Sequence, residues 1–314
     1  MFYLALFALI VLDPKTKLKL AIGWAFAWVL IGWLFLFQAD KLLKRNFQTA
    51  GTVTFVDVGH GSSVLLQLPF GKTMLYDAGS LASPNFATQT ISNLLWRNGI
   101  EHIDAVMISH ADLDHFNAIP ELIERFSIGV LYVSVPMLDK ESDSKRRLFE
   151  LLDKNQVPIR TLAWNDRVEL EDGSTMEIVL PPEFGTDDSD NSNSIVVSID
   201  VNDCQLLLPG DLEGNGMHLL LQTKPVDCDV VMMPHHGSKN SRPVEFMNWC
   251  RAEKAVISCG ASKLNQSVVE DVRKLDCEVF STAEMGSVRL KLQPGQMQVE
   301  HFADSRWWAV APAQ

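Results

Sequence analysis

Two histidines and two aspartates lie within six positions of the stretch 109–118, which reads SHADLDHFNA. The apolar run IDAVMI directly before this stretch predicts a buried strand. A divalent metal ion needs about three or four nitrogen or oxygen ligands that converge on one point, and a short loop leaving a rigid strand can provide them. A solvated turn with an aspartate N-cap is the alternative. The spacing favours an active-site loop whose metal ligands are His110, Asp112, Asp114 and His115.

Acids and histidines recur at or directly after the ends of other apolar runs. Asp77 follows TMLY, Asp211 follows LLLPG, and the pair His235-His236 follows VVMMP. Each alone has a structural explanation, as a turn aspartate, a helix N-cap or a satisfied histidine. Because open α/β sheets place their sites at the carboxyl ends of strands, the four features together predict a binuclear metal site. Imidazole and carboxylate ligands without thiolates suit zinc or manganese and do not decide between them.

From residue 51 onward, the sequence pattern predicts two halves with the same order of strands and helices. Each half begins with short β-rich runs separated by turns and continues with alternating strands and helices, among them helices over 88–98, 119–126 and 139–155. Two such halves predict an α/β (α+β) fold in which two sheets pack face to face with helices outside.

The first part of the chain has a different composition. Residues 1–12 are almost wholly apolar, and residues 21–37 are apolar without interruption, contain three tryptophans and are flanked by charges. The second run is close to the roughly 20 residues that cross a bilayer. We therefore predict a transmembrane hairpin and linker over 1–46 and a separate domain over 47–314. A signal peptide and a buried helix are the alternatives.

Composition excludes some classes of function. The net charge of −12 over 314 residues argues against a broad basic surface for nucleic acid. It leaves a nucleic-acid substrate open, because bound metal ions would bring local positive charge. The five cysteines are odd in number and lack CxxC spacing, which argues against a disulfide framework or a cysteine zinc site.

These motifs resemble a known family. The loop HADLDH, the pair Gly210-Asp211 and the run HHGS from His235 are similar to the metallo-β-lactamase superfamily. More narrowly, FVDVGHGSS, YDAG and PHHGS resemble the carboxy-terminal domain of ComEC-type competence proteins, which are polytopic membrane proteins of bacterial DNA uptake. The resemblance extends over about residues 52–302 and implies a metallo-β-lactamase αββα sandwich.

The resemblance also implies an activity and its setting. We expect a metal-dependent hydrolase, specifically a DNA phosphodiesterase or nuclease, that uses two divalent zinc or manganese ions. DNA, mainly single-stranded, is the expected substrate, with other DNA-uptake components as partners. The expected location is the outer face of the cytoplasmic membrane.

Site roles follow residue by residue from the matched motifs. The expected metal ligands are His110, Asp112, Asp114, His115, Asp211 and His235. The expected catalytic residues are Asp114 and His236, the latter also an alternative to His235 as ligand. The residues expected to contact substrate are Asp57, His60, Asp77, Asn193 and Ser238, with a turn role as the alternative for Asp57 and His60.

Three departures from the family pattern concern the first metal site and the first loop. Asp112 stands where the superfamily usually has histidine, and no histidine occurs between His115 and His218, where another ligand is expected. In the first loop, His60 and Ser62 replace the usual Gln and Asp. The sequence therefore leaves two alternatives: hydrolysis of another bond, such as a lactone or thioester, or a weakly active domain that guides DNA in a transport channel.

Overall fold

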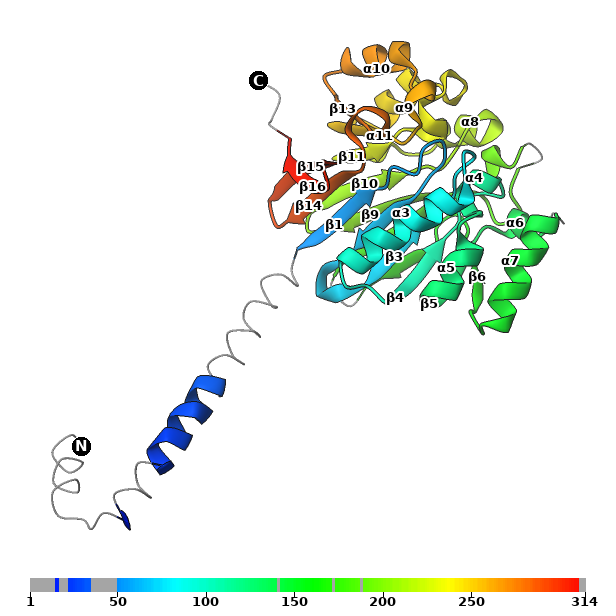
Figure 1. Cartoon of the computed structure of the whole chain (residues 1–314). Helices are drawn as coiled ribbons and strands as arrows, with labels where there is room; N and C mark the ends of the chain where they lie inside the picture. The colour runs from blue at the N-terminus through cyan, green and yellow to red at the C-terminus, as the bar shows by residue number, and fades with distance from the viewer. Residues whose placement is uncertain are drawn as a thin grey trace. The chain divides into compact units, whose positions relative to one another are not determined.

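The structure is a computed structural model that describes residues 15–16, 22–34, 50–139, 142–170, 173–186 and 189–310. The chain divides into two compact units, Met1–Thr49 and Ala50–Gln314, which Figure 1 colours from blue to red along the chain. We describe each unit by itself.

The first unit contains a helical stretch at residues 22–34 with exposed apolar side chains, including Trp24, Trp28 and Trp33. Across the described ranges, no helix has both the length and the apolar character needed to cross a membrane. Of the predicted transmembrane hairpin, the second arm over 21–37 is described only at residues 22–34, which are helical. Residues 1–12, its first arm, lie outside the described residues.

In the described part of the second unit, sixteen strands form two sheets. The nine-stranded sheet has the order β16-β15-β14-β1-β2-β3-β4-β5-β6. Its strands are β1 (Gly51–Phe55), β2 (Val64–Gln67), β3 (Thr73–Tyr76), β4 (His102–Met107), β5 (Ser127–Val133), β6 (Ile159–Thr161), β14 (Val288–Gln293), β15 (Gln296–Ala303) and β16 (Arg306–Ala309). The seven-stranded sheet has the order β13-β12-β11-β10-β9-β8-β7. Its strands are β7 (Arg167–Glu169), β8 (Thr175–Leu180), β9 (Val196–Val201), β10 (Cys204–Leu208), β11 (Val230–Met232), β12 (Lys254–Ile257) and β13 (Glu278–Ser281).

Each sheet joins an antiparallel part to a parallel part. In the first sheet β1, β2 and β3 pair antiparallel and β3 to β6 pair parallel. In the second, β8, β9 and β10 pair antiparallel and β10 to β13 pair parallel. Parallel neighbours end at the same edge, so the loops after β3, β4, β10 and β11 carry the sequence motifs to the sheet edges.

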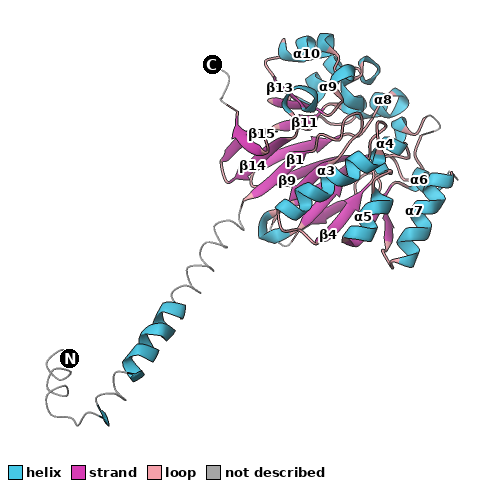
Figure 2. Ribbon diagram, in the orientation of Figure 1, coloured by secondary structure: helices cyan, strands magenta, loops and turns pink. Residues whose placement is uncertain are grey.

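Helices cover the outer faces of both sheets (Figure 2). The main ones are α3 (Pro84–Arg97), α5 (Ile119–Arg125), α7 (Asp143–Lys154), α8 (Gly214–Gln222), α9 (Pro243–Cys250) and α10 (Gln266–Arg273). Shorter helices are α4 (Leu113–Phe116), α6 (Val135–Asp139) and α11 (Thr282–Met285).

Alternation along the strands divides the core into three apolar layers. Leu66 and Leu206 point into the core between the sheets, whereas the adjacent Leu65 and Leu207 pack under the outer helices. This is the side-chain period of two that a strand imposes. The predicted two-sheet sandwich with outer helices is confirmed.

Two predicted helices differ in their bounds. The helix predicted over 88–98 begins at Pro84, because Ser83 caps it by accepting a hydrogen bond from the amide of Phe86 at 3.3 Å. The helix predicted over 139–155 corresponds to α7, which begins later, at Asp143, after the separate short helix α6 has ended at Asp139. Ser142 starts α7 by accepting a hydrogen bond from the amide of Lys145.

Candidate metal centre

The predicted ligand loops meet where the two sheets touch. The hydroxyl of Tyr76, at the end of β3, donates to the carbonyl of Ile195 at 2.7 Å in the other half of the fold. The amide of Ile195 in turn donates to the carbonyl of Ser109 at 2.8 Å. The amide of His235 donates to the carbonyl of Gly210 at 3.1 Å. These bonds bring the loops after β3, β4, β10 and β11 to one place.

Two glycines allow this close approach. A side chain on Gly79 would put its Cβ 2.5 Å from the backbone carbonyl carbon of Asp114. Gly210 has φ +58°, and a Cβ there would lie 2.7 Å from that of Ser109. Because both contacts are shorter than real Cβ contacts, only glycine lets the ligand loops lie against one another.

Two overlapping sets of buried side chains have the donor types and spacing of metal sites. The first set is His110, His115 and Asp211, and the second is Asp114, His115 and His236, with the candidate ligand atoms of each set within 4.8 Å of one another. The Nε2 atom of His236 lies 3.5 Å from Oδ2 of Asp114 and 3.4 Å from Oδ2 of Asp211. Nε2 of His115 lies 3.4 Å from Oδ1 of Asp211. Asp211 is thus positioned between the histidines of both sets.

Asp77 orients His115. Its Oδ2 accepts a hydrogen bond from Nδ1 of His115 at 2.8 Å, and its two oxygens also accept from the amide and hydroxyl of Ser109 at 2.7 and 2.9 Å. The Asp77 side chain is fully buried. The proton of His115 is therefore held on Nδ1, which leaves the Nε2 lone pair facing the cluster. This contact gives Asp77 an orienting role, and its predicted contact with substrate remains untested.

The two neighbouring histidines are held by different partners, although the Nε2 atom of each lies near Oδ2 of Asp211, at 3.8 Å for His235 and 3.4 Å for His236. Both have left-handed backbone conformations, with φ +48° at His235 and +55° at His236, which L-residues adopt at a cost of about 1–2 kcal/mol each. Nδ1 of His236 donates to the carbonyl of Ser258 at 2.7 Å, so its Nε2 faces the cluster. His235 is 29% exposed and its Nδ1 bonds to Glu213 at 2.7 Å. The geometry therefore favours His236 over His235 as a metal ligand.

The His110–Asp112 part of the cluster is more open. Nδ1 of His110 contacts the hydroxyl of Ser109 at 2.9 Å, and its Nε2 lies 3.4 Å from Oδ2 of Asp112. The side chain of His110 is only 1% exposed, whereas that of Asp112 is 48% exposed.

Three Nε2 atoms that face the cluster are buried without a hydrogen bond. They belong to His110, His115 and His236, and within the described ranges none has a partner in hydrogen-bonding geometry. A buried polar atom left without a partner costs about 1–3 kcal/mol. Coordination of a divalent metal ion would satisfy all three atoms, because neutral imidazole and carboxylate are its usual nitrogen and oxygen ligands. The residues present therefore fit a metal centre.

Opposite charges shift the pKa values inside the cluster. Burial lowers the pKa of His115, but the carboxylates of Asp211 and Asp77 outweigh burial and raise it well above its usual value. For His236, Asp211 and Asp114 likewise outweigh burial, so its pKa is also raised. Burial raises the pKa of Asp211, but His115 and His236 hold it well below the usual value. Without metal, the cluster is thus a set of mutually stabilised charges.

Of the other predicted substrate contacts, His60 lies beside the cluster. Its ring centroid is 4.8 Å from that of His236, and its Nδ1 is buried without a hydrogen bond to any described residue. Burial, and then the positive charge of His236, lower the pKa of His60. A neutral imidazole therefore lies at the edge of the cluster, and the predicted contact of His60 with substrate remains untested.

The remaining three predicted contacts are used within their own loops. Oδ1 of Asp57 accepts from the amide of Gly59 at 3.2 Å. The amide side chain of Asn193 bonds to Thr186 and Ser189. The hydroxyl of Ser238 accepts from the amide of Asn240 at 3.2 Å. The structure brings none of these three into the cluster, and their predicted contact with substrate remains untested.

Three orienting residues escaped the sequence analysis. Ser109 bonds to Asp77, and Ser258 and Glu213 bond to the paired histidines. Glu213 follows Asp211 by two positions and is the one with a sequence signal, an acid next to a predicted ligand. Ser258 contributes its backbone carbonyl, to which the residue type gives no clue.

The comparison with protein families agrees with this geometry. Residues 56–242, more than half of the chain, match the model of the Metallo-beta-lactamase superfamily. The chain belongs to this superfamily, as its motifs predict.

Two named relatives are similar to most of this chain. The chain is 24% identical over 259 residues to ComE operon protein 3 of Bacillus subtilis, covering 77% of this chain and 33% of the relative. It is 26% identical over 262 residues to Competence protein ComA of Neisseria gonorrhoeae, covering 81% and 34%. The chain thus spans about a third of the length of these relatives. Among solved structures, CmlA β-hydroxylase (E377D mutant) matches with a TM-score of 0.50 and 14% identity, covering 77% of this chain and 54% of the other, which is a likeness of fold alone.

Proposed function

We propose that this chain is a metal-dependent hydrolase that cleaves phosphodiester bonds of DNA during DNA uptake. The observation that carries the proposal is the convergence of three buried, unpartnered histidine Nε2 atoms on two carboxylates. Buried nitrogen atoms without a hydrogen-bond partner are costly, and a bound metal ion would satisfy them.

Two divalent ions, zinc or manganese, are the proposed cofactors. Asp114, His115, His236 and Asp211 would hold one ion, and His110, Asp112 and Asp211 would hold the other. His235 takes an outer position, because Glu213 holds it and part of its side chain is exposed. When bound, such ions polarise the scissile group and activate water.

The chain's own residues keep the ligands in a reactive state. Asp77 holds a proton on Nδ1 of His115, and the carbonyl of Ser258 does the same for His236. Both histidines therefore offer neutral Nε2 atoms to the metal once its charge displaces their second proton. His60, with its lowered pKa, contributes an uncharged hydrogen-bonding group to the substrate.

The choice of DNA rests on the relatives and the motifs. A relative carries competence in its name, and the motifs resemble ComEC-type competence proteins of bacterial DNA uptake. We therefore propose single-stranded DNA as the substrate, other uptake components as partners, and the outer face of the cytoplasmic membrane as the place of action. A weakly active domain that guides DNA is the second candidate, favoured by the 48% exposure of the Asp112 side chain.

The test compares metal content and cleavage in the full chain. We expect the parent chain to bind divalent metal and to cleave single-stranded DNA with Zn²⁺ or Mn²⁺. Asp114→Asn should lower the rate at least about 100-fold, because it removes a charged ligand. Asp143→Asn, at a side chain 91% exposed on α7, is the matched control. Unchanged metal-dependent cleavage in Asp114→Asn would refute the assignment, and DNA binding without bound metal would favour the guiding domain.

A further inference from the structure

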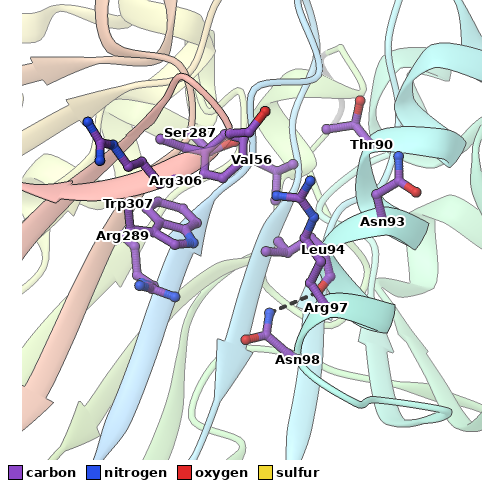
Figure 3. A pocket seen from close by; sticks show the side chains of 12 residues that line it. Val56, Thr90, Asn93, Leu94, Arg97, Asn98, Ser287, Arg289, Arg306 and Trp307 are labelled. Atoms are coloured by element: carbon purple, nitrogen blue, oxygen red, sulfur yellow. Dashed lines mark hydrogen bonds between the residues drawn. The ribbon is translucent and has the colours of Figure 1, made fainter.

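A cavity of about 370 Å³ lies away from the metal centre, between α3 and the strands β14 to β16. Its walls carry three arginines and two aromatic side chains: Arg97, Arg289, Arg306, Phe302 and Trp307. We call this cavity the arginine pocket. Figure 3 shows the side chains of α3, among them Asn93 and Arg97, on one side and those of Arg289, Arg306 and Trp307 on the other.

Two of the three arginines offer free positive charge. Arg289 is paired, because its Nε donates to Glu300 at 2.9 Å, and Glu300 also pairs with Lys291 at 2.6 Å. Within the described part of the chain, no carboxylate pairs with Arg97 or Arg306. Two unpaired guanidinium groups at one pocket stand out in a chain of net charge −12. Guanidinium groups match phosphate oxygens in a bidentate way, so the pocket is complementary to a phosphate-bearing ligand.

Aromatic rings hold the arginines in place. The Cζ atom of Arg97 lies 5.2 Å from the centroid of Phe302, that of Arg289 lies 4.0 Å from Trp307, and that of Arg306 lies 3.6 Å from Trp308. Cation–π contacts of this kind lie within the usual limit of about 6 Å. They restrain the guanidinium planes, which reduces the entropy lost when a phosphate binds.

The same pocket can accept a planar base. Phe302 and Trp307 are half-buried, and the amide of Asn93 is exposed beside them. Its volume falls in the range of about 300–1,000 Å³ that small-molecule sites occupy. Basic groups interleaved with aromatic rings are the composition of surfaces that bind single-stranded nucleic acid, because every base offers a face for stacking. A paired base has both faces covered and its edge occupied, so an unpaired base suits the pocket.

The helix α3 connects the pocket to the metal centre. The amide of Leu81, just before the helix, donates to the carbonyl of His60 at 2.7 Å, and His60 lies beside the cluster. Arg97 is the last residue of α3. At about 1.5 Å per residue, the 14-residue helix is roughly 21 Å long. A strand of a few nucleotides therefore reaches from one site to the other.

We propose that the arginine pocket binds an unpaired nucleotide of a DNA strand whose other end lies at the metal centre. The proposal rests on the proposed function, because it takes DNA as the substrate. It assigns Arg97 and Arg306 to the phosphate and Trp307 to the base.

The test measures binding of a fluorescent oligothymidylate to the full chain by anisotropy, with chelator present so that cleavage does not interfere. We expect Arg97→Ala combined with Arg306→Ala to weaken binding about tenfold or more. The slope of log K against log salt should shrink by about 0.7 for each arginine lost. Trp307→Leu should weaken binding at least about fivefold without changing the slope, because stacking carries no charge.

Arg273→Ala is the matched control. Arg273 is an exposed arginine in the last turn of α10, as Arg97 is in the last turn of α3. This variant should bind like the parent chain. Arg97→Lys together with Arg306→Lys should keep the salt slope and lose only part of the affinity. That result would show that the alanine variants bind weakly because they lack the positive charges, not because they are misfolded.

The outcomes distinguish the two proposals. If the double alanine variant binds like the parent chain, the arginine pocket is not the nucleotide site, even if DNA is cleaved. Loss of binding in that variant supports the pocket even if no phosphodiester is hydrolysed, in which case only the proposed hydrolysis fails. Equal competition by polyglutamate or by duplex DNA also overturns the proposal, because the pocket would then bind acidic peptides or phosphates without an unpaired base.

Discussion

The metal centre has two ends that differ in how their ligands are held. The inner end consists of Asp114, His115 and His236, and the outer end consists of His110 and Asp112. At the inner end Asp77 and the carbonyl of Ser258 fix the two imidazoles from distant parts of the chain. At the outer end, His110 bonds to the adjacent Ser109, and the side chain of Asp112 is 48% exposed.

This difference teaches that ligand type alone does not make a strong metal site. Both ends carry histidine and aspartate from one loop. At the inner end, buried hydrogen-bond partners already hold the ligands in place, whereas Asp112 at the outer end must be ordered when metal binds. Partners that hold a ligand typically change metal affinity by 10–100-fold. We therefore expect the inner end to fill first.

The largest effect should come from Asp211, the carboxylate between the two ends. Asp211→Asn removes a charge that faces Nε2 of His115 at 3.4 Å and Nε2 of His236 at 3.4 Å. We expect both metal ions to be lost and the rate of DNA cleavage to fall by about 1,000-fold. Metal analysis of the purified chain and a cleavage assay measure the two effects, with Asp143→Asn as control. Retention of two ions per chain would show that Asp211 is not shared between the ends.

Substitutions of His235 and His236 should show which of the two residues is a metal ligand. His236→Gln removes a buried ligand that faces Asp114 and Asp211, so activity should fall by about 100-fold or more. His235→Gln disturbs the contact with Glu213 at 2.7 Å and a longer one with Asp211 at 3.8 Å, on a side chain that is 29% exposed, and should cost a few-fold. Steady-state cleavage at saturating metal compares the two variants. Equal losses would contradict the assignment of His236 as the ligand.

The sequence predicts the two-sheet fold and the ligand loops because both depend on local patterns. Apolar runs of strand length mark the sheets, and acids and histidines at their ends mark the loops. The HADLDH loop needs no information from the rest of the chain, since its residues are neighbours.

Orientation within the site could not be predicted in the same way. The partner of His115 is Asp77, 38 positions away, and that of His236 is a carbonyl 22 positions away. Which of His235 and His236 faces the cluster depends on two consecutive left-handed conformations. Such conformations are imposed by the packed fold and are invisible in a two-residue motif.

Substitution of Asp77 measures how much the hydrogen bonds at the inner end contribute to metal affinity. Asp77→Asn keeps the shape but leaves one oxygen to accept from three donors, and its NH₂ group faces the amide or hydroxyl of Ser109. We expect metal affinity at the inner end to fall about 10–100-fold, because His115 loses its fixed orientation. Competition with a chromophoric chelator measures the affinity. Asp57→Asn, in a turn outside the cluster, should leave the affinity unchanged.

Protons compete with metal for the imidazoles of the inner end, so its metal affinity should depend on pH. Without metal the pKa values of His115 and His236 are raised, so both rings hold an extra proton at and above pH 6.5, their usual value. Metal must displace those protons, and affinity should rise about tenfold per pH unit for each proton released. Calorimetry in buffers of different ionisation enthalpy counts the protons. Affinity independent of pH between about 6.5 and 8 would contradict the raised pKa values.

The same pKa shifts make the stability of the metal-free chain depend on pH. Histidines with raised pKa contribute stability that is present below pH 6.5 and is lost as pH rises through their raised pKa values. Asp211, with a lowered pKa, contributes stability that is present above pH 3.8 and is lost as pH falls through its lowered pKa. Thermal melts of the metal-free chain should therefore decline at both extremes, and metal should remove the decline at high pH.

The smallest effect should come from Asp112 at the outer end. Because its side chain is half exposed and lies 3.4 Å from Nε2 of His110, Asp112→Asn should lower activity only about threefold at saturating metal. Asp112→His, which restores the residue usual in the superfamily, should instead raise occupancy of the outer end, since imidazole nitrogen is a usual zinc ligand. Metal titration of both variants against the parent chain gives the number of ions bound. If Asp112→Asn were as damaging as Asp211→Asn, the two ends would be equal in strength, and exposure would not decide which ligands matter.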